Sequence, residues 1–444
     1  MREGSLEAPI RHPLAWNDPD FVDDKKLDAE MRRQFDICHT CRRCFNLCDS
    51  FPRLFDLIDQ SKTGELDAVP SEAFKPVVDA CTLCDMCFMT KCPYVPPHEF
   101  DMDIPHLFLR YRAAELADGD GSFIDKQIAE TDRNGKLAGL VAPLANWATD
   151  TRNGLTRPVM AKVAHIHPKA ALPKFHGKTL TARARTKIEP NKDAPAFGKR
   201  KAVLYATCYG NYNNPEIGEA ARAVLAKNGV ETEVAYPGCC GMPMLERGDI
   251  ARVARNAAEV AAGLKPWIEK GYDVIALVPS CALMLKFEWP LIVTDNEDVK
   301  LLSRSAHDIA EYIVDIAKTE GLAPGLKPVE GGVAVHLACH ARAQNLGPKA
   351  AEMLRLIPET DVQVIERCSG HGGSWGIKSE NFDVALKVGR PVARQAAEAK
   401  TRHVVSECPL AGLHILQGME RIEGAAVPET APHPIQIIAR AYGV

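Results

Sequence analysis

The sequence predicts a multidomain α+β protein, in which a helical module near the N-terminus precedes two tandem parallel α/β domains. Two runs of four cysteines lie within residues 38–92 and are joined by helix-like sequence. Residues 200–444 carry an internal repeat in which strand-like apolar runs alternate with helix-like segments, a pattern typical of parallel α/β domains. A stretch rich in proline and polar residues, 172–199, separates the two parts and indicates a linker.

The helical module contains two cysteine runs with nearly the same spacing. The first run reads Cys38-x2-Cys41-x2-Cys44-x3-Cys48, and the second reads Cys81-x2-Cys84-x2-Cys87-x4-Cys92-Pro93. Three cysteines in C-x2-C steps, followed by a fourth, form the bacterial-ferredoxin pattern for [4Fe–4S] clusters, and in two-cluster modules the fourth cysteine ligates the other cluster. The predicted ligand sets are therefore Cys38, Cys41, Cys44 and Cys92 for one cluster, and Cys81, Cys84, Cys87 and Cys48 for the other.

Two details depart from this pattern. Asp49 follows Cys48 where proline is usual, and four residues instead of three precede Cys92. A pair of zinc sites is the alternative interpretation, although zinc sites rarely use three cysteines in C-x2-C steps followed by a fourth. Amphipathic sequence over 51–80 predicts helices between the runs. We therefore expect a helical ferredoxin module with two [4Fe–4S] clusters over residues 31–117.

The segments around this module are expected to be less regular. Residues 1–30 should form an extended N-terminal arm, because three prolines interrupt any continuous helix. Residues 118–199 should form a helical connection and linker. Within it, the apolar stretch 137–148 contains Trp147 and has basic neighbours, so it could lie at a membrane surface. Packing on the body of the protein is the favoured interpretation, and no apolar run reaches the roughly 20 residues that span a bilayer.

The two α/β domains are expected at 200–325 and 330–444. Their strand-like runs are 202–206, 231–236 and 274–278 in the first domain, and 333–337, 362–366 and 403–406 in the second. Every cysteine of this half directly follows one of these runs. Because ligands bind beyond the carboxyl ends of parallel strands, we expect the cysteines of each domain to converge at one edge of its sheet. The two sets are Cys208, Cys239, Cys240 and Cys281, and Cys339, Cys368 and Cys408. The alternative is that these cysteines are small buried hydrophobic residues.

The sequence Cys239-Cys240-Gly241, with Cys208 before it and Cys281 after it, resembles the cysteine-rich CCG domains of the heterodisulfide reductase B subunit family. Joined to the ferredoxin-like module, this order is similar to the C-subunit family of anaerobic glycerol-3-phosphate dehydrogenase. The resemblance implies iron–sulfur ligands in both α/β domains. In this chain the closing cysteine of each copy is replaced, by Met284 and by Ala411, and Ser369 replaces the second cysteine of the pair in the second copy.

These replacements bear on what the α/β domains could bind. The resemblance implies that the four cysteines of the first copy could hold a further iron–sulfur cluster, with zinc as the alternative. The three cysteines of the second copy would need a ligand such as His336, His340 or His371, or an external one. An open coordination position is what metal catalysis requires. His340 and His371 are therefore candidate ligands or proton donors, with structural hydrogen bonding as the other possibility.

Composition and motifs exclude several function classes. The net charge is −4 and no basic run follows a pattern typical of nucleic-acid binding. The 15 cysteines, together with an N-terminus that lacks an apolar core segment, predict a cytoplasmic, reducing location. Peripheral attachment to the inner face of the membrane stays open. The glycine-rich 370–376 lacks the spacing of a dinucleotide-binding fingerprint, so hydride transfer by this chain alone is not expected.

Together these features predict an iron–sulfur electron-transfer subunit of an oxidoreductase. It would pass electrons between a flavoprotein or similar redox partner and an acceptor, either a quinone at a membrane surface or a disulfide. One alternative is a self-contained thiol/disulfide-type reductase that uses a metal cluster in the first CCG domain. Another is a scaffold that docks a partner and whose CCG sites hold zinc or nothing.

Overall fold

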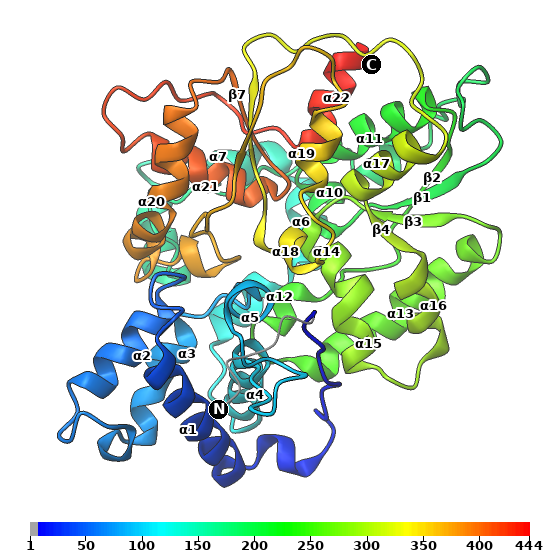
Figure 1. The fold of residues 1–444 in the computed structure, drawn as a ribbon. Helices are drawn as coiled ribbons and strands as arrows, with labels where there is room; N and C mark the ends of the chain where they lie inside the picture. The colour runs from blue at the N-terminus through cyan, green and yellow to red at the C-terminus, as the bar shows by residue number, and fades with distance from the viewer. Residues whose placement is uncertain (1–7) are drawn as a thin grey trace.

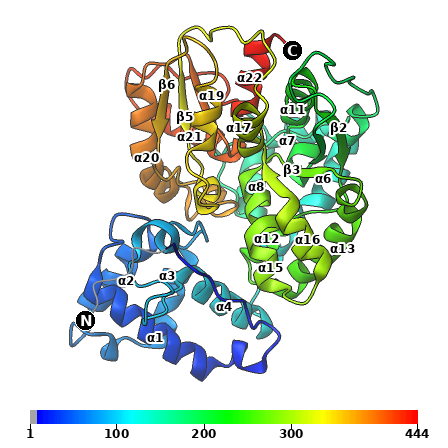
Figure 2. The same cartoon turned by 45° about the vertical axis from the view of Figure 1, so that its right-hand side comes forward.

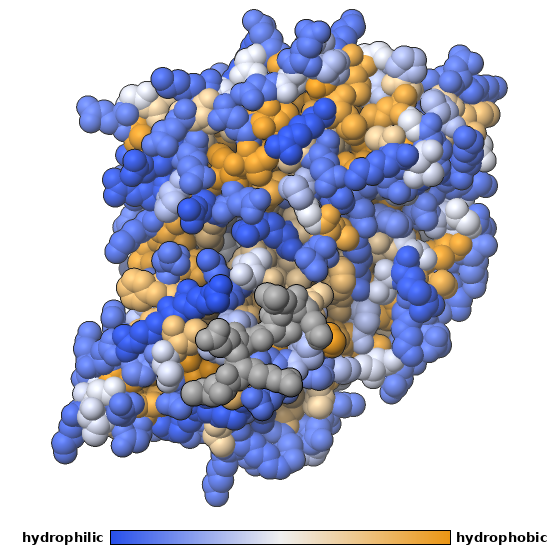
Figure 3. All heavy atoms as spheres, viewed as in Figure 1, coloured by the Kyte–Doolittle hydropathy of each residue, from blue (hydrophilic) through white to orange (hydrophobic). Residues whose placement is uncertain are grey.

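The computed structural model describes residues 8–444 (Figure 1). The start of the expected arm, and the N-terminal residues on which the expected absence of a signal peptide rests, lie outside the described residues. In Figures 1 and 2 a helical N-terminal module lies below two α/β domains that stand side by side. On the face drawn in Figure 3, hydrophilic side chains cover most of the outer edge and hydrophobic residues appear in the hollows between elements.

The N-terminal module is built from short helices around an aromatic core. Phe35 lies edge-to-face with Phe74 and Phe108, with ring centroids 5.1 and 5.8 Å apart. The first long helix begins where the Asp23 carboxylate accepts the backbone N–H of Lys26. The helices are η1 (Pro19–Val22), α1 (Asp24–Cys41), α2 (Ser50–Asp59), η2 (Leu66–Ala68), η3 (Ser71–Phe74), α3 (Lys75–Asp79), η4 (Cys87–Lys91) and α4 (Ile104–Ala117).

Among the described residues, five helices form the connection to the α/β domains. Its helices are α5 (Phe123–Ala129), α6 (Thr131–Leu140), α7 (Ala142–Thr149), α8 (Thr156–Ala164) and α9 (Leu180–Arg183). Arg157, in the first turn of α8, is buried and donates to the carbonyl oxygens of Pro168, His167 and Ala170, at 2.9, 2.7 and 2.6 Å. These bonds hold the irregular chain after α8 in place. None of the helices in residues 8–444 is long and apolar enough to cross a membrane.

The first α/β domain contains a parallel sheet in the order β2-β1-β3-β4. Its strands are β1 (Lys201–Tyr205), β2 (Glu231–Ala235), β3 (Asp273–Ala276) and β4 (Ala306–Asp308). The fourth strand was not predicted, because its three residues, Ala-His-Asp, are too few and too polar to show a strand pattern. The helices of this domain are α10 (Cys208–Tyr212), α11 (Pro215–Lys227), α12 (Met242–Leu245), α13 (Ile250–Ile268), α14 (Pro279–Leu283), η5 (Met284–Glu288), α15 (Trp289–Ile292), α16 (Glu297–Ser305) and α17 (Ile309–Thr319).

The second α/β domain repeats the first three strands of the first domain. Its parallel sheet has the order β6-β5-β7, with β5 (Val333–His336), β6 (Val362–Ile365) and β7 (His403–Ser406). Val335 pairs with Val364 on one side and Val405 on the other, as Leu204 in β1 pairs with Val234 and Ile275. Its helices are α18 (Cys339–Ala343), α19 (Lys349–Leu354), η6 (Trp375–Ile377), α20 (Phe382–Glu398), α21 (Pro409–Met419) and α22 (Pro434–Tyr442). The prediction of two tandem parallel α/β domains is confirmed.

The two domains share one hydrophobic core. The last helix, α22, packs against α11 of the first domain, and Ile435 and Ile438 are fully buried there together with Leu225. The Tyr442 hydroxyl donates to the carbonyl oxygen of Ala323 at 2.9 Å. The chain end of the second domain thus covers the first domain, and the pair forms one structural unit.

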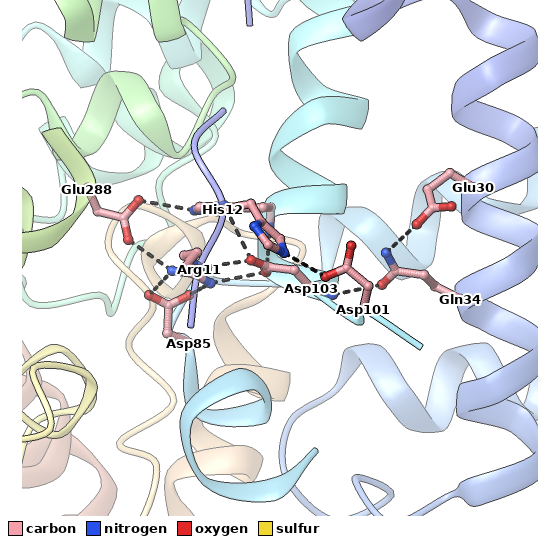
Figure 4. Close-up of polar contacts among 9 residues, drawn as sticks. Arg11, His12, Glu30, Gln34, Asp85, Asp101, Asp103 and Glu288 are labelled. Atoms are coloured by element: carbon pink, nitrogen blue, oxygen red, sulfur yellow. Dashed lines mark hydrogen bonds and ion pairs between the residues drawn. The ribbon is translucent and has the colours of Figure 1, made fainter. Parts of the chain in front are cut away.

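The arm joins the N-terminal module to the first α/β domain through Arg11, whose side chain is only 11% exposed (Figure 4). Arg11 contacts the carboxylates of Asp103 and Asp85, each at 2.8 Å, and that of Glu288 at 3.0 Å. Burial alone would raise the pKa of Glu288, but Arg11 and His106 lower it to about 2. Two of these carboxylates belong to the module and one to the first domain. The arginine therefore fixes how the two parts meet.

Candidate functional site

The first predicted cysteine set surrounds a single pocket of the N-terminal module. The structure places Cys38, Cys41, Cys44 and Cys92 around this pocket with apolar neighbours that include Phe51 and Phe55. Two of the thiols come from the last turn of α1, which Arg42 ends in a left-handed conformation, and one follows η4. Burial, followed by the Cys92 thiol, raises the pKa of Cys44 to about 12.

The second predicted set lies beside the first and is also assembled from both runs. Besides burial, which is the largest cause, Cys84, Cys81, Cys44 and Cys48 all raise the pKa of Cys87. Burial and then Cys81 raise the pKa of Cys48 to about 12. The loop turns sharply at Leu83 and Asp85, whose φ angles are 47° and 62°, and the Leu83 N–H donates to the Cys81 sulfur at 3.4 Å.

The donor chemistry of both sets fits a [4Fe–4S] cluster. Each set offers four thiols to a common site with an apolar surround and backbone N–H groups nearby, which are features of iron–sulfur sites. Burial keeps the free thiols protonated at neutral pH, as the pKa of about 11 for Cys92 illustrates. A bound metal centre would have to displace those protons, so binding should release them. No group of three or more His, Cys, Asp or Glu side chains in residues 8–444 is arranged to hold a single metal ion.

In the first α/β domain the four cysteines lie close together, and all of them except Cys208 are buried. The sulfurs of Cys240 and Cys281 are 3.2 Å apart, and those of Cys239 and Cys208 are 3.8 Å apart. Hydrogen bonding with Cys208 and then with Cys240 lowers the pKa of Cys239, and the Gly241 N–H, which donates to the Cys239 sulfur at 3.4 Å, lowers it further. Met284, at the position of the missing cysteine, is fully buried in the same hydrophobic cluster as Cys240 and Cys281.

An unpredicted residue completes this site. Thr131, the first residue of α6, donates from its hydroxyl to the Cys208 sulfur at 3.4 Å and lies 3.6 Å from the Cys239 sulfur. The next residue, Asp132, accepts hydrogen bonds from the hydroxyls of Tyr236 and Tyr212, at 2.8 and 3.1 Å. Thr131 precedes β1 by 70 residues. No local motif in the sequence links it to the cysteines.

In the second α/β domain the three cysteines line an open cavity of about 600 Å³. Cys339, Cys368 and Cys408 face it from one side, and Cys48 and Cys84 of the N-terminal module face it from the other. Ser369 and Ala411, which replace family cysteines, both line the cavity. Two replaced positions of the second domain thus line open space, whereas Met284 of the first domain is fully buried.

The turn that carries Cys368 repeats the geometry of the first domain. The Gly370 N–H donates to the Cys368 sulfur at 3.3 Å, as the Gly241 N–H does to Cys239, and the two glycines have φ angles of 75° and 85°. A Cβ atom at Gly370 would lie 2.0 Å from the carbonyl oxygen of Ala385. Glycine is required there by both backbone conformation and space.

The candidate histidines differ in their hydrogen bonding. In His340 the Nδ1 atom lies 2.8 Å from the Ser280 hydroxyl and the Nε2 atom 3.1 Å from the Leu83 carbonyl, so its ring links three parts of the chain. In His336 both ring nitrogens are also engaged, with Ser406 and with the Arg367 carbonyl. Of these three histidines, only His371 has a buried Nε2 atom without a partner in the described residues.

The cavity also carries ionisable side chains. Lys91, Arg342, Arg367 and Lys387 line it together with Asp49, Glu246 and Glu366. Burial raises the pKa of Glu246 to about 7, against a smaller lowering by Arg112. Burial lowers the pKa of His371 to about 3, so this imidazole is neutral. Glu246, which sequence patterns did not single out, can hold a proton at neutral pH beside the cysteines.

Comparison with known proteins places the cysteine sites in a family context. Residues 202–286 and 333–415 match the cysteine-rich CCG domain. The chain is 27% identical over 284 residues to the C subunit of anaerobic glycerol-3-phosphate dehydrogenase from Escherichia coli, covering 63% of this chain and 69% of that protein.

Two further relatives carry other names. The chain is 28% identical over 224 residues to the B subunit of fumarate reductase (CoM/CoB) from Methanothermobacter marburgensis, covering 49% of this chain and 42% of the relative. It is 25% identical over 215 residues to lactate utilization protein A from Oceanobacillus iheyensis, covering 46% of this chain and 84% of the relative. The resemblance stated from the sequence motifs is therefore confirmed.

Proposed function

We propose that this chain, which carries two CCG cysteine-rich domains and is homologous to the C subunit of anaerobic glycerol-3-phosphate dehydrogenase, is the iron–sulfur electron-transfer subunit of an oxidoreductase. The names of its relatives include subunits of a dehydrogenase and of a reductase, which supports an electron-transfer role in general. The specific proposal is transfer between a flavoprotein or similar donor and a quinone or disulfide acceptor.

The observation that carries this proposal is a continuous row of four cysteine sets. Each set lies close enough to the next that a sulfur of one set raises the pKa of a thiol in the other, although burial is the larger cause in each case. Cys44 acts in this way on Cys87, Cys339 on Cys84, and Cys281 on Cys408. The row therefore runs from the first ferredoxin-like set to the second, then to the second α/β domain, and ends in the first. When bound, [4Fe–4S] clusters supply one-electron transfer.

The overall reaction balances with groups of this chain as proton carriers. A reduced flavin in the donor loses two electrons and two protons. A quinone that gains two electrons and two protons becomes a hydroquinone, and a disulfide that gains the same becomes two thiols. Glu246, which lines the cavity and has a pKa of about 7, can hold a proton beside the row at neutral pH. Lys91 and Arg342 line the same cavity and would orient an anionic disulfide there, as the second candidate function requires.

The cavity favours a second candidate, a self-contained reductase of small disulfides. The sequence pattern assigned this role to the first domain, but its cysteines are closely packed. The space for a substrate lies instead beside Cys339, Cys368 and Cys408. Turnover of a small disulfide with an artificial electron donor and no partner protein would support this candidate over the electron-transfer role.

Substitution of Cys240 tests the primary proposal. Cys240→Ala removes a sulfur that lies 3.2 Å from Cys281, deep in the first α/β domain and far along the row. We expect the variant to lose acceptor reduction, while the electron paramagnetic resonance signals of both ferredoxin-type clusters persist.

Metal analysis completes this test. Two [4Fe–4S] clusters account for about eight iron atoms per chain, so a higher iron content in the anaerobically purified protein requires iron in a CCG domain. Loss of all cluster signals in Cys240→Ala would contradict the separation of the two halves. A colourless, zinc-containing protein would favour the scaffold alternative.

A further inference from the structure

Large exposed apolar side chains concentrate on the helices α5 to α8. Nine of the seventeen such side chains in residues 8–444 lie in this segment, and Leu140 and Leu155 are 84% and 77% exposed. We call these nine residues the α5–α8 face: Phe123, Leu137, Leu140, Val141, Leu144, Trp147, Leu155, Val159 and Val163. Isolated exposed leucines are common, but a concentration of this kind indicates an interaction surface.

Helical spacing directs this face away from the protein body. Leu137 and Leu140 lie three residues apart on α6, Leu144 and Trp147 three apart on α7, and Val159 and Val163 four apart on α8. The opposite side of α6 packs through glycines. A Cβ atom at Gly135 would lie 2.4 Å from the ring of Tyr212. The expectation that 137–148 packs on the body therefore describes only the inner side of these helices.

The segment around this face is positively charged, although the whole chain is negative. Residues 123–178 contain nine Lys or Arg and four Asp or Glu, a net charge of +5, against −4 for the whole chain. Each of the four acidic residues has a basic ion-pair partner, and two of these partners, Lys378 and Arg252, come from outside the segment. Lys162, Lys169, Lys174 and Lys178 are exposed. Apolar side chains among exposed lysines match a bilayer with anionic headgroups.

We propose that the α5–α8 face docks on the surface of an anionic lipid bilayer. The helices lie in the interface and do not cross it, since α6 and α7 contain 10 and 8 residues and a span needs roughly 20. Trp147, which is 54% exposed, has the amphipathic ring that is enriched at headgroup level. The lysines supply attraction to the anionic headgroups, and the leucines and valines enter the acyl boundary.

This docking would bring one end of the cysteine row to the membrane. Thr131 at the start of α6 contacts Cys208 and Cys239, while Leu140 at its other end belongs to the α5–α8 face. At about 1.5 Å per residue, the two ends of the helix are roughly 14 Å apart. This part of the inference rests on the proposed function: the first α/β domain is then the end of the row that a lipid-soluble acceptor reaches.

Vesicle binding by the full, anaerobically purified chain tests the docking. The probes are sedimenting vesicles of phosphatidylcholine alone and of phosphatidylcholine with about one-third phosphatidylglycerol. We expect binding to the anionic vesicles, weaker binding at high salt, and little binding to the neutral ones. In the double variant Leu140→Glu, Leu144→Glu, binding should fall at least about tenfold, because each buried leucine contributes favourable transfer free energy.

Two further variants make the result specific. The control Ile188→Glu, Leu356→Glu adds the same charge at exposed apolar positions outside the face and should bind as the unmodified chain does. The double variant Lys162→Glu, Lys174→Glu leaves the apolar side chains unchanged and should bind anionic vesicles much more weakly than the unmodified chain does.

Three outcomes would overturn the docking proposal. The first is that the unmodified chain does not bind vesicles. The second is that the Leu140→Glu, Leu144→Glu variant binds them equally well. The third is that no vesicle binding is seen and the same variant loses a complex with a redox protein. The last outcome would identify the face as a protein interface. Iron content and cluster spectra are recorded on the same samples, so failure of the electron-transfer proposal would show there, independently of vesicle binding.

Discussion

At the scale of single residues, the replaced cysteines of the two CCG domains lie in different surroundings. Met284 of the first domain is fully buried, in the hydrophobic cluster that also contains Cys240 and Cys281. Ser369 and Ala411 of the second domain both line the cavity of about 600 Å³. The sequence identified all three replacements. It could not show their consequences, because the fit of a side chain depends on neighbours brought from other parts of the chain.

Glu246 supplies a prediction at the same scale. Burial raises its pKa in the folded protein to about 7, above its ordinary value. The folded state therefore holds this proton more tightly than the unfolded state, and the associated stability is lost as pH rises through about 7. Glu246→Gln removes this dependence, so above pH 7 the variant should gain stability relative to the unmodified chain, on the order of 2 kcal/mol.

Thermal unfolding of both proteins between pH 5 and 9 would measure the effect of Glu246. Measurements near pH 5 serve as the control. There Glu246 is protonated in the folded protein and is uncharged, like the glutamine of the variant, so the two stabilities should differ least. Parallel pH profiles across the whole range would contradict the raised pKa.

At the scale of elements, periodicity and strand-end cysteines predicted the α/β repeat well. The six strand-like runs became strands within one or two residues of their expected ends. The missed strand, β4, contains Ala306, His307 and Asp308 and pairs with β3 only after α16 returns the chain to the sheet. The sequence also did not show what covers the outer face of α6 and α7, since hydrophobic periodicity shows that a helix has an apolar side but not what covers that side.

The last helix gives a prediction at this scale. His433 caps α22 by accepting the Ile435 N–H at its Nδ1 atom, and burial lowers its pKa to about 3. The unfolded state gains a proton on this residue as pH falls below about 6.5, whereas the folded state does not until about pH 3. Stability should therefore be lost between these values, at about 1.4 kcal/mol per pH unit.

His433→Asn isolates this contribution, because asparagine also caps helices but does not titrate. The variant should lose less thermal stability than the unmodified chain between pH 7 and pH 5, whatever its absolute stability at pH 7. If both chains show the same acid sensitivity, the buried neutral histidine does not contribute as proposed.

At the scale of the whole molecule, side chains from distant segments hold the row of cysteine sets together. Arg11 connects the arm, the N-terminal module and the first α/β domain. His340 of the second domain binds Ser280 of the first domain and the Leu83 carbonyl of the module. These contacts lie next to cysteines of three different sets. They fix the order in which the sets follow one another.

Arg11 provides the prediction for the whole molecule. Arg11→Met leaves the carboxylates of Asp85, Asp103 and Glu288 buried without their arginine, so it should cost about 3–5 kcal/mol of stability at neutral pH. The cost should shrink in acid, because protonation neutralises carboxylates that have lost their partner.

Chemical denaturation at pH 7 and pH 5 would measure the loss in Arg11→Met. The matched control is Arg152→Met, since Arg152 forms an ion pair with Asp150 and its side chain is 89% exposed; this variant should stay close to the unmodified chain in stability, because solvent screens exposed ion pairs. Equal losses in the two variants would show that the buried junction does not hold the parts together.

The sequence by itself determined which segments form helices and strands, the repeat of the α/β domain and the grouping of the cysteines into sets, because periodicity and spacing are local properties of the chain. The sequence also predicted that the fourth cysteine of each run belongs with the other run. In the structure Cys92 lines the pocket of the first run, and Cys81, after burial, raises the pKa of Cys48. Only the tertiary structure decided that Cys84 faces Cys339 across a cavity, that Thr131 reaches Cys208, and that Leu140 points outward. These relations join segments far apart in the chain, and they depend on how whole elements pack against each other.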